Sequence, residues 1–115
     1  MTALAELHRH LDGSLRPGTV ADLALDLGLA VPEDLCFFPG MGLAAALARF
    51  AFTLSLLQTP AAVRRVAAEV VEDATAEGVT TLEVRFAPQL HRGAAPEAIV
   101  EAVLEGLGGR AGLIL

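Results

Sequence analysis

Lysine is absent from this 115-residue sequence, and its eight basic residues, all arginines, are outnumbered by fourteen aspartates and glutamates. The resulting net charge of −6 leaves no basic patch of the kind that attracts phosphate backbones. We therefore expect no nucleic-acid partner.

Cysteine is nearly absent as well. Cys36 is the one cysteine, which rules out an internal disulfide and fits a reducing compartment. The sequence shows no cationic start followed by an apolar run and a cleavage site, so no secretory signal is visible. The longest apolar-rich stretch, residues 41–57, is interrupted by Arg49 and predicts a buried helix. These features predict a cytoplasmic protein without a membrane partner.

Apolar residues, by contrast, are abundant. They make up 54% of the chain, and the mean hydropathy is +0.56. Free-standing soluble domains contain about 45–50%. The length is enough for one small domain, but this composition is typical of a piece of a larger core.

Apolar periodicity and turn residues divide the chain into strands and helices. The pattern predicts strands at residues 5–11, 79–87 and 111–115, and helices at residues 17–27, 43–57, 60–77 and 96–107. This alternation favours an α/β fold with parallel strands joined by helical crossovers. The loop at residues 30–42 contains Phe37 and Phe38, which either pin the loop to the core or line a lid over a pocket. Burial of apolar area favours the first reading.

The strand at residues 79–87 has two distinct faces. One is apolar and consists of Leu82, Val84 and Phe86. The other is polar and consists of Thr81, Glu83 and Arg85. An antiparallel strand with one wet face would show the same pattern. In a parallel barrel, the apolar face would pack outward on helices and the polar face would point inward, where charges must be paired.

The strongest chemical signal is the segment at residues 6–13, Glu-Leu-His-Arg-His-Leu-Asp-Gly. Residues two apart on a strand point the same way, so Glu6, His8, His10 and Asp12 share one face. Two imidazoles on one face can reach one metal ion, and zinc binds neutral histidine nitrogens at about 2.0–2.1 Å. Gly13 then permits a sharp turn. Two exposed histidines at a strand end are the alternative, since zinc needs three or four ligands.

The third histidine, His91, follows the second strand in a loop at residues 89–93. It is out of phase with that strand, and loop histidines are usually solvated. We therefore expect His91 to lie in solvent rather than on a metal.

Two segments resemble the adenosine deaminase family of metal-dependent amidohydrolases. They are residues 6–17, Glu-Leu-His-Arg-His-Leu-Asp-Gly-Ser-Leu-Arg-Pro, and residues 78–91, Gly-Val-Thr-Thr-Leu-Glu-Val-Arg-Phe-Ala-Pro-Gln-Leu-His. The resemblance implies the amino-terminal portion of a (β/α)8 TIM-type barrel, with about three of eight strands present. It also implies that His8 and His10 are zinc ligands and that Asp12 bonds a ribose hydroxyl. His10 and Asp12 would thus contact a purine nucleoside substrate.

The reaction that the resemblance implies is the zinc-dependent hydrolysis of adenosine to inosine and ammonia. The family also uses a third histidine ligand, an aspartate ligand, a glutamate proton shuttle and a second aspartate, none of which this chain supplies. We therefore expect residues 1–115 to be incomplete as a domain, to require the rest of the barrel, and to be inactive alone. A deaminase of a related 6-aminopurine or nucleoside, or a truncated non-catalytic remnant or interaction module, is the alternative. A cytidine-deaminase type of zinc site needs several cysteines and is excluded.

Overall fold

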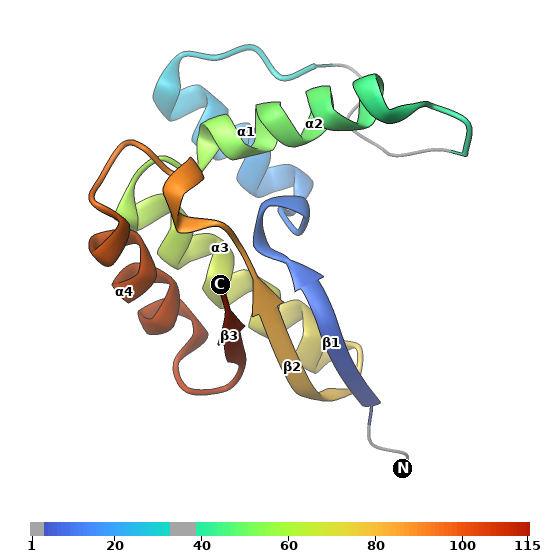
Figure 1. Ribbon diagram of the computed structural model, residues 1–115, viewed down its shortest axis with the longest axis vertical. Helices are drawn as coiled ribbons and strands as arrows, with labels where there is room; N and C mark the ends of the chain where they lie inside the picture. Colours follow the sequence, from blue (N-terminus) through green and yellow to red (C-terminus); the bar gives the residue numbers. More distant parts are fainter. Residues whose placement is uncertain (1–3, 33–38) are drawn as a thin grey trace.

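The computed structural model describes residues 4–32 and 39–115. Cys36, Phe37 and Phe38, and with them the two readings of their loop, lie outside these residues. The elements follow the order β1 (Leu4–His10), a 3-10 turn η1 (Leu11–Gly13), α1 (Pro17–Leu27), α2 (Leu43–Leu56), α3 (Pro60–Ala76), β2 (Val79–Arg85), a second 3-10 turn η2 (Pro88–Leu90), α4 (Pro96–Leu107) and β3 (Gly112–Ile114), as Figure 1 shows.

The three strands form one parallel sheet in the order β1-β2-β3. This confirms the parallel reading over the antiparallel one. Its apolar face packs on helices: Leu82 and Phe86 are 6% exposed and Val84 is fully buried. In register, His10 pairs with Arg85, and Arg85 pairs with Ile114. These three residues therefore lie level with one another across the sheet, near the carboxyl ends of its strands.

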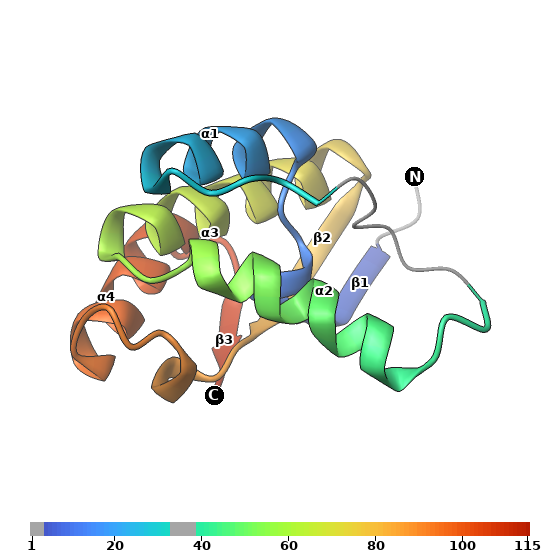
Figure 2. The same cartoon turned by 90° about the horizontal axis from the view of Figure 1, so that it is seen from above.

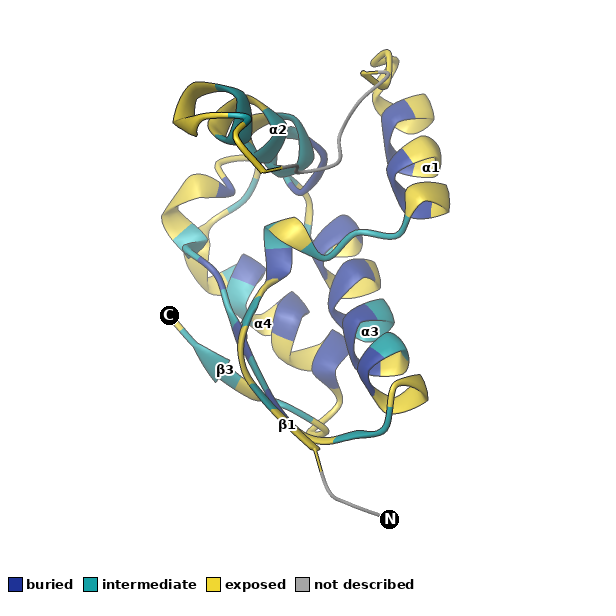
Figure 3. Ribbon diagram, turned by 90° about the vertical axis from the view of Figure 1, so that its right-hand side faces the viewer, coloured by how far each residue is buried: buried dark blue, intermediate teal, exposed yellow. Residues whose placement is uncertain are grey.

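The core lies between this sheet and two helices, α3 and α4, whose buried faces are visible in Figure 3. The helix predicted at residues 60–77 is confirmed as α3, and one face of it is fully buried: Val63, Val66, Ala67, Val70, Val71 and Ala74. The helix begins where expected, because the Thr59 side chain accepts a hydrogen bond from the backbone N–H of Ala62 at 3.2 Å and Pro60 follows.

The first strand is as long as predicted but lies one residue earlier, at Leu4–His10 instead of residues 5–11. It ends at His10, and Leu11 begins the η1 turn instead of continuing the strand. The Leu11 side chain is fully buried, so the turn places this leucine in the core beneath the strand end. The cause is apolar burial, which outweighs extension of the strand by one more residue.

The prediction of a buried helix at residues 41–57 is wrong for the amino-terminal half of α2. Leu43 is 75% exposed and Leu47 is 56% exposed, whereas Leu56 is 2% exposed and Leu57 fully buried. Figure 2 shows this half of α2 projecting away from α3 and α4. The apolar stripe is present, but only its carboxyl-terminal end meets the core.

No single helix among residues 4–32 and 39–115 is both long and apolar enough to cross a membrane. The pair α2 and α3 passes that length and composition test only when taken together, and the two helices meet at a 115° bend.

Candidate metal and substrate site

The two histidines at the end of β1 meet in the structure. Their Nε2 atoms are 3.0 Å apart, and the ring centroids of His8 and His10 are 4.9 Å apart at an interplanar angle of 62°. Both side chains are exposed. The strand therefore presents two imidazoles from one side, as its alternation predicts.

The separation of these nitrogens fits a shared zinc ion. Two nitrogen ligands at about 2.0–2.1 Å from zinc, at a tetrahedral angle, lie about 3.3–3.4 Å from each other. The observed 3.0 Å is close to that value. It also suits a hydrogen bond in which one Nε2–H donates to the other ring's lone pair. Within the described part of the chain, no group of three or more histidine, cysteine, aspartate or glutamate side chains could hold a metal. His8 and His10 thus fit as part of a ligand set.

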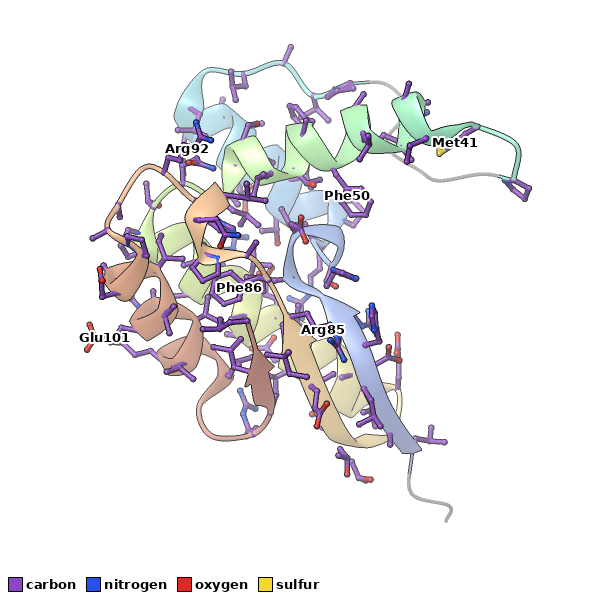
Figure 4. The ribbon with its side chains drawn as sticks, in the orientation of Figure 1. Met41, Phe50, Arg85, Phe86, Arg92 and Glu101 are labelled. Carbon is purple, nitrogen blue, oxygen red and sulfur yellow. The ribbon has the colours of Figure 1, made fainter. Side chains whose placement is uncertain are left out.

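The turn after β1 is fixed by local hydrogen bonds. The Ser14 hydroxyl donates to the His10 carbonyl at 2.6 Å, and the Ser14 N–H donates to the Leu11 carbonyl at 3.2 Å. A turn follows the strand as predicted, but Gly13 is not in the left-handed backbone region, so the turn itself does not require glycine. A Cβ there would lie 3.2 Å from Cε1 of Phe50 on α2. The position therefore favours glycine because the Phe50 side chain approaches it closely. Figure 4 labels Phe50 on α2.

A hollow of about 360 Å³ opens beside this turn. His10 and Asp12 line it from the end of β1, and Arg85 lines it from the end of β2. Arg85 lies beside β1 in Figure 4, where its Nη2 donates to the Leu7 carbonyl at 3.3 Å. Its Nε is buried without a hydrogen-bond partner among residues 4–32 and 39–115. Glu83, predicted to share the polar face of this strand with Arg85, is half-buried but does not line this hollow.

His91 also lines the hollow, and the prediction that it is solvated is wrong. Its side chain is 2% exposed. The ring lies edge-on to Phe86 with centroids 5.4 Å apart, and its Nδ1 is 2.6 Å from the Leu57 carbonyl. The η2 turn causes this burial, because it folds the chain back after β2. The available sequence signal was Pro88, which begins that turn.

A charge network ties the start of α1 to α3. The Arg16 guanidinium, at the N-cap of α1, donates to Asp73 from Nε at 3.1 Å and from Nη2 at 2.8 Å, and Nη2 also donates to Glu72 at 3.1 Å. The hydrogen bonds from Arg16 hold the pKa of Asp73 below its usual value. Thr19, which is 1% exposed, donates its hydroxyl to Glu69 at 2.5 Å. These three acids of α3 thus anchor the segment that follows the site turn.

Solved structures share this fold. An adenine deaminase from Arthrobacter aurescens matches with a TM-score of 0.81 at 28% identity, over all of this chain and 39% of its own. An amidohydrolase from Burkholderia ambifaria with bound Zn matches with a TM-score of 0.75 at 25% identity, over 97% of this chain and 35% of its own. The fold is therefore that of the TIM-barrel amidohydrolases, of which this chain carries three parallel strands.

Sequence comparison identifies one family within that fold class. The profile described as "Adenosine deaminase" matches residues 3–111. The adenosine deaminase of Shewanella halifaxensis is 46% identical over 113 residues, and that of Mycobacteroides abscessus is 45% identical over 114 residues. This chain belongs to the adenosine deaminase family. Both alignments cover 89% of the chain but only 34% and 32% of those relatives, so it spans about a third of their length.

Proposed function

We propose that this chain supplies the zinc-binding strand end of an enzyme that hydrolyses adenosine to inosine and ammonia. The observation that carries the proposal is the meeting of the His8 and His10 Nε2 atoms, 3.0 Å apart, where β1 ends. Active sites of parallel barrels lie at the carboxyl ends of the strands. The names of the relatives, and the zinc in the amidohydrolase structure, support the same chemistry.

Each residue then has a stated task. His8 and His10 offer neutral Nε2 lone pairs to the ion, and Asp12 accepts a hydrogen bond from a ribose hydroxyl beside His10. Zinc, when bound, lowers the pKa of a bound water toward about 7, so hydroxide is available at neutral pH. The water oxygen replaces the exocyclic amino group of the purine, which leaves as ammonia.

We also propose that residues 1–115 are an incomplete domain. They form the amino-terminal part of a deaminase barrel and depend on its remaining strands for the other ligands. Two imidazoles leave about half of a four-coordinate zinc shell to water. The 115-residue chain alone is therefore proposed to bind zinc weakly and to leave adenosine unchanged. A cytoplasmic location, a purine nucleoside as the small-molecule partner, and no nucleic-acid or membrane partner belong to the same proposal.

The test is an ammonia-release assay with adenosine on two proteins. One is the 115-residue chain, and the other is the product of its reading frame expressed to the stop codon. If the frame continues past Leu115, the longer product releases ammonia when zinc is present and loses this activity in His8→Ala and His10→Ala. Zinc-loaded longer product that releases no ammonia from adenosine would contradict the proposal. Tight stoichiometric zinc with turnover by the 115-residue chain would contradict its incompleteness.

A second candidate substrate class is a related 6-aminopurine. It is favoured by the fold match to an adenine deaminase and by a match to an N6-mAMP deaminase from Arabidopsis, with a TM-score of 0.72 at 27% identity. A panel of adenosine, adenine and adenosine 5′-phosphate on the longer product decides between them. A frame that stops at Leu115 favours the third candidate, a non-catalytic remnant or interaction module.

A further inference from the structure

His91 is the one buried histidine among the described residues, and the proposed zinc chemistry does not use it. It reaches the hollow from the η2 turn after β2, on a different segment from His10 and Asp12. A histidine that is 2% exposed has given up nearly all contact with water. Its two ring nitrogens therefore need partners, or one of them faces a site.

One of these nitrogens has a partner. Nδ1 lies 2.6 Å from the Leu57 carbonyl, which can only accept, so Nδ1 carries the proton and donates. In a neutral ring, this leaves Nε2 with a lone pair. This hydrogen bond uses Nδ1, no hydrogen bond joins Nε2 to another group within residues 4–32 and 39–115, and the ring lines the hollow.

The ring is also held in place. Phe86 lies edge-on to it at 5.4 Å, and the backbone N–H of His91 donates to the Pro88 carbonyl at 3.1 Å. Such fixed geometry makes Nε2 a preorganised acceptor, because little rotational freedom is lost when a donor arrives. Asp12 adds a second acceptor to the same hollow. Arg85 also lines the hollow and can only donate, so a ligand group that bonds to Asp12 or to His91 Nε2 must itself be a hydrogen-bond donor.

We propose that His91 Nε2 accepts a hydrogen bond from a sugar hydroxyl of the substrate, so that the hollow selects nucleosides over free purine bases. This rests on the proposed function: the reacting amino group must face His8 and His10, which leaves the hydroxyl-bearing part of the ligand for His91 and Asp12. A hollow of about 360 Å³ lies within the range of small-molecule pockets, roughly 300–1,000 Å³.

Two variants separate this role from a purely structural one. His91→Asn places an amide N–H where Nδ1 stands and keeps a donor for the Leu57 carbonyl, but it has nothing at the Nε2 position. His91→Gln places an amide oxygen near the Nε2 position and gives up that donor. A binding role predicts that His91→Asn weakens adenosine binding by roughly two- to tenfold, the worth of one neutral hydrogen bond, and that His91→Gln restores part of it.

The experiment is ring-nitrogen NMR on the 115-residue chain, titrated with millimolar adenosine and, separately, with adenine. The chain has three histidines, so single variants assign every ring. Without ligand, we expect the His91 ring to carry its proton on Nδ1. Adenosine then shifts the Nε2 resonance of His91 and adenine does not.

Three results would overturn the inference in distinguishable ways. Adenosine that shifts the His10 ring but not the His91 ring removes the role of His91 and leaves the proposed function standing. Equal binding by His91→Asn and wild type, with loss in His91→Gln, makes His91 a structural clamp on Leu57. Adenosine that shifts no ring and shows no binding contradicts the inference and the nucleoside site together.

Discussion

Gly106 shows how a single residue sets the distance between two helices. A Cβ added there would lie 2.3 Å from the Arg64 carbonyl oxygen and 2.8 Å from the Ala67 Cβ, both on α3. The α3 backbone thus runs directly against this position of α4. Any side chain larger than hydrogen would force the two helices apart.

We therefore predict that Gly106→Ala lowers the free energy of unfolding by about 1–3 kcal/mol, the usual cost of overpacking a core. Urea denaturation measures it. Gly18→Ala is the matched control, because Gly18 lies in α1 at a normal φ with no atom within 4 Å of the added Cβ. It should be neutral or stabilise by up to about 1 kcal/mol. Equal effects of the two variants would contradict the close approach of α3 and α4.

The sequence predicted part of the residue-scale site. Alternation along a strand was enough to place His8 and His10 on one face, because that depends only on neighbouring residues. The burial of His91 could not be read in this way. It depends on a contact with the Leu57 carbonyl, thirty-four positions away, and on a ring contact with Phe86. The close approach of Phe50 to Gly13 was missed for the same reason, since Phe50 belongs to another element.

Among the elements, α2 is attached at its carboxyl-terminal end. Leu56 is 2% exposed, while Leu47 on the same helix is 56% exposed. We predict that Leu56→Ala lowers the free energy of unfolding by about 2–5 kcal/mol, because it empties a filled core position. Leu47→Ala should change it by no more than about 0.5 kcal/mol. Chemical denaturation of the pair decides: a large loss in Leu47→Ala would show that the amino-terminal half of α2 is packed after all.

The contact between the start of α1 and α3 depends on the ionised Asp73 carboxylate. Hydrogen bonding to Arg16 depresses the pKa of Asp73 below its usual 3.8 in the folded protein. As the pH falls, the unfolded chain therefore takes up a proton before the folded protein does, so the stabilisation is complete above about pH 5 and is lost progressively at lower pH.

The expected result is a fall in the urea midpoint of the wild type between pH 5 and pH 3 that is smaller in Asp73→Asn. Asp26→Asn is a control, because Asp26 is an exposed acid of α1 outside this network. It should keep the full pH dependence of the wild type. Identical pH profiles for the wild type and Asp73→Asn would contradict the role of the Arg16–Asp73 contact.

Element boundaries and types were largely predictable, because helix starts are marked by prolines and apolar stripes repeat at helical spacing. What the pattern could not show was how much of a stripe meets the core, as the two halves of α2 demonstrate. It also could not show that the polar face of α3 contacts Arg16, because a charged residue next to solvent and one beside a distant guanidinium look the same in sequence.

At the scale of the whole molecule, three parallel strands present the ends of β1 and β2 to one hollow, with helices behind the sheet (Figure 1). The chain that carries this arrangement belongs to the adenosine deaminase family. We propose that two imidazoles from one strand bind the same ion, at a site that further residues complete.

X-ray absorption at the zinc edge tests this claim most directly, on the 115-residue chain in excess over zinc. We predict two imidazole nitrogens at about 2.0–2.1 Å, with oxygen ligands in the other positions. His8→Ala and His10→Ala should each remove one imidazole, while His91→Asn should retain both. An imidazole count that does not change in His8→Ala and His10→Ala would contradict the account.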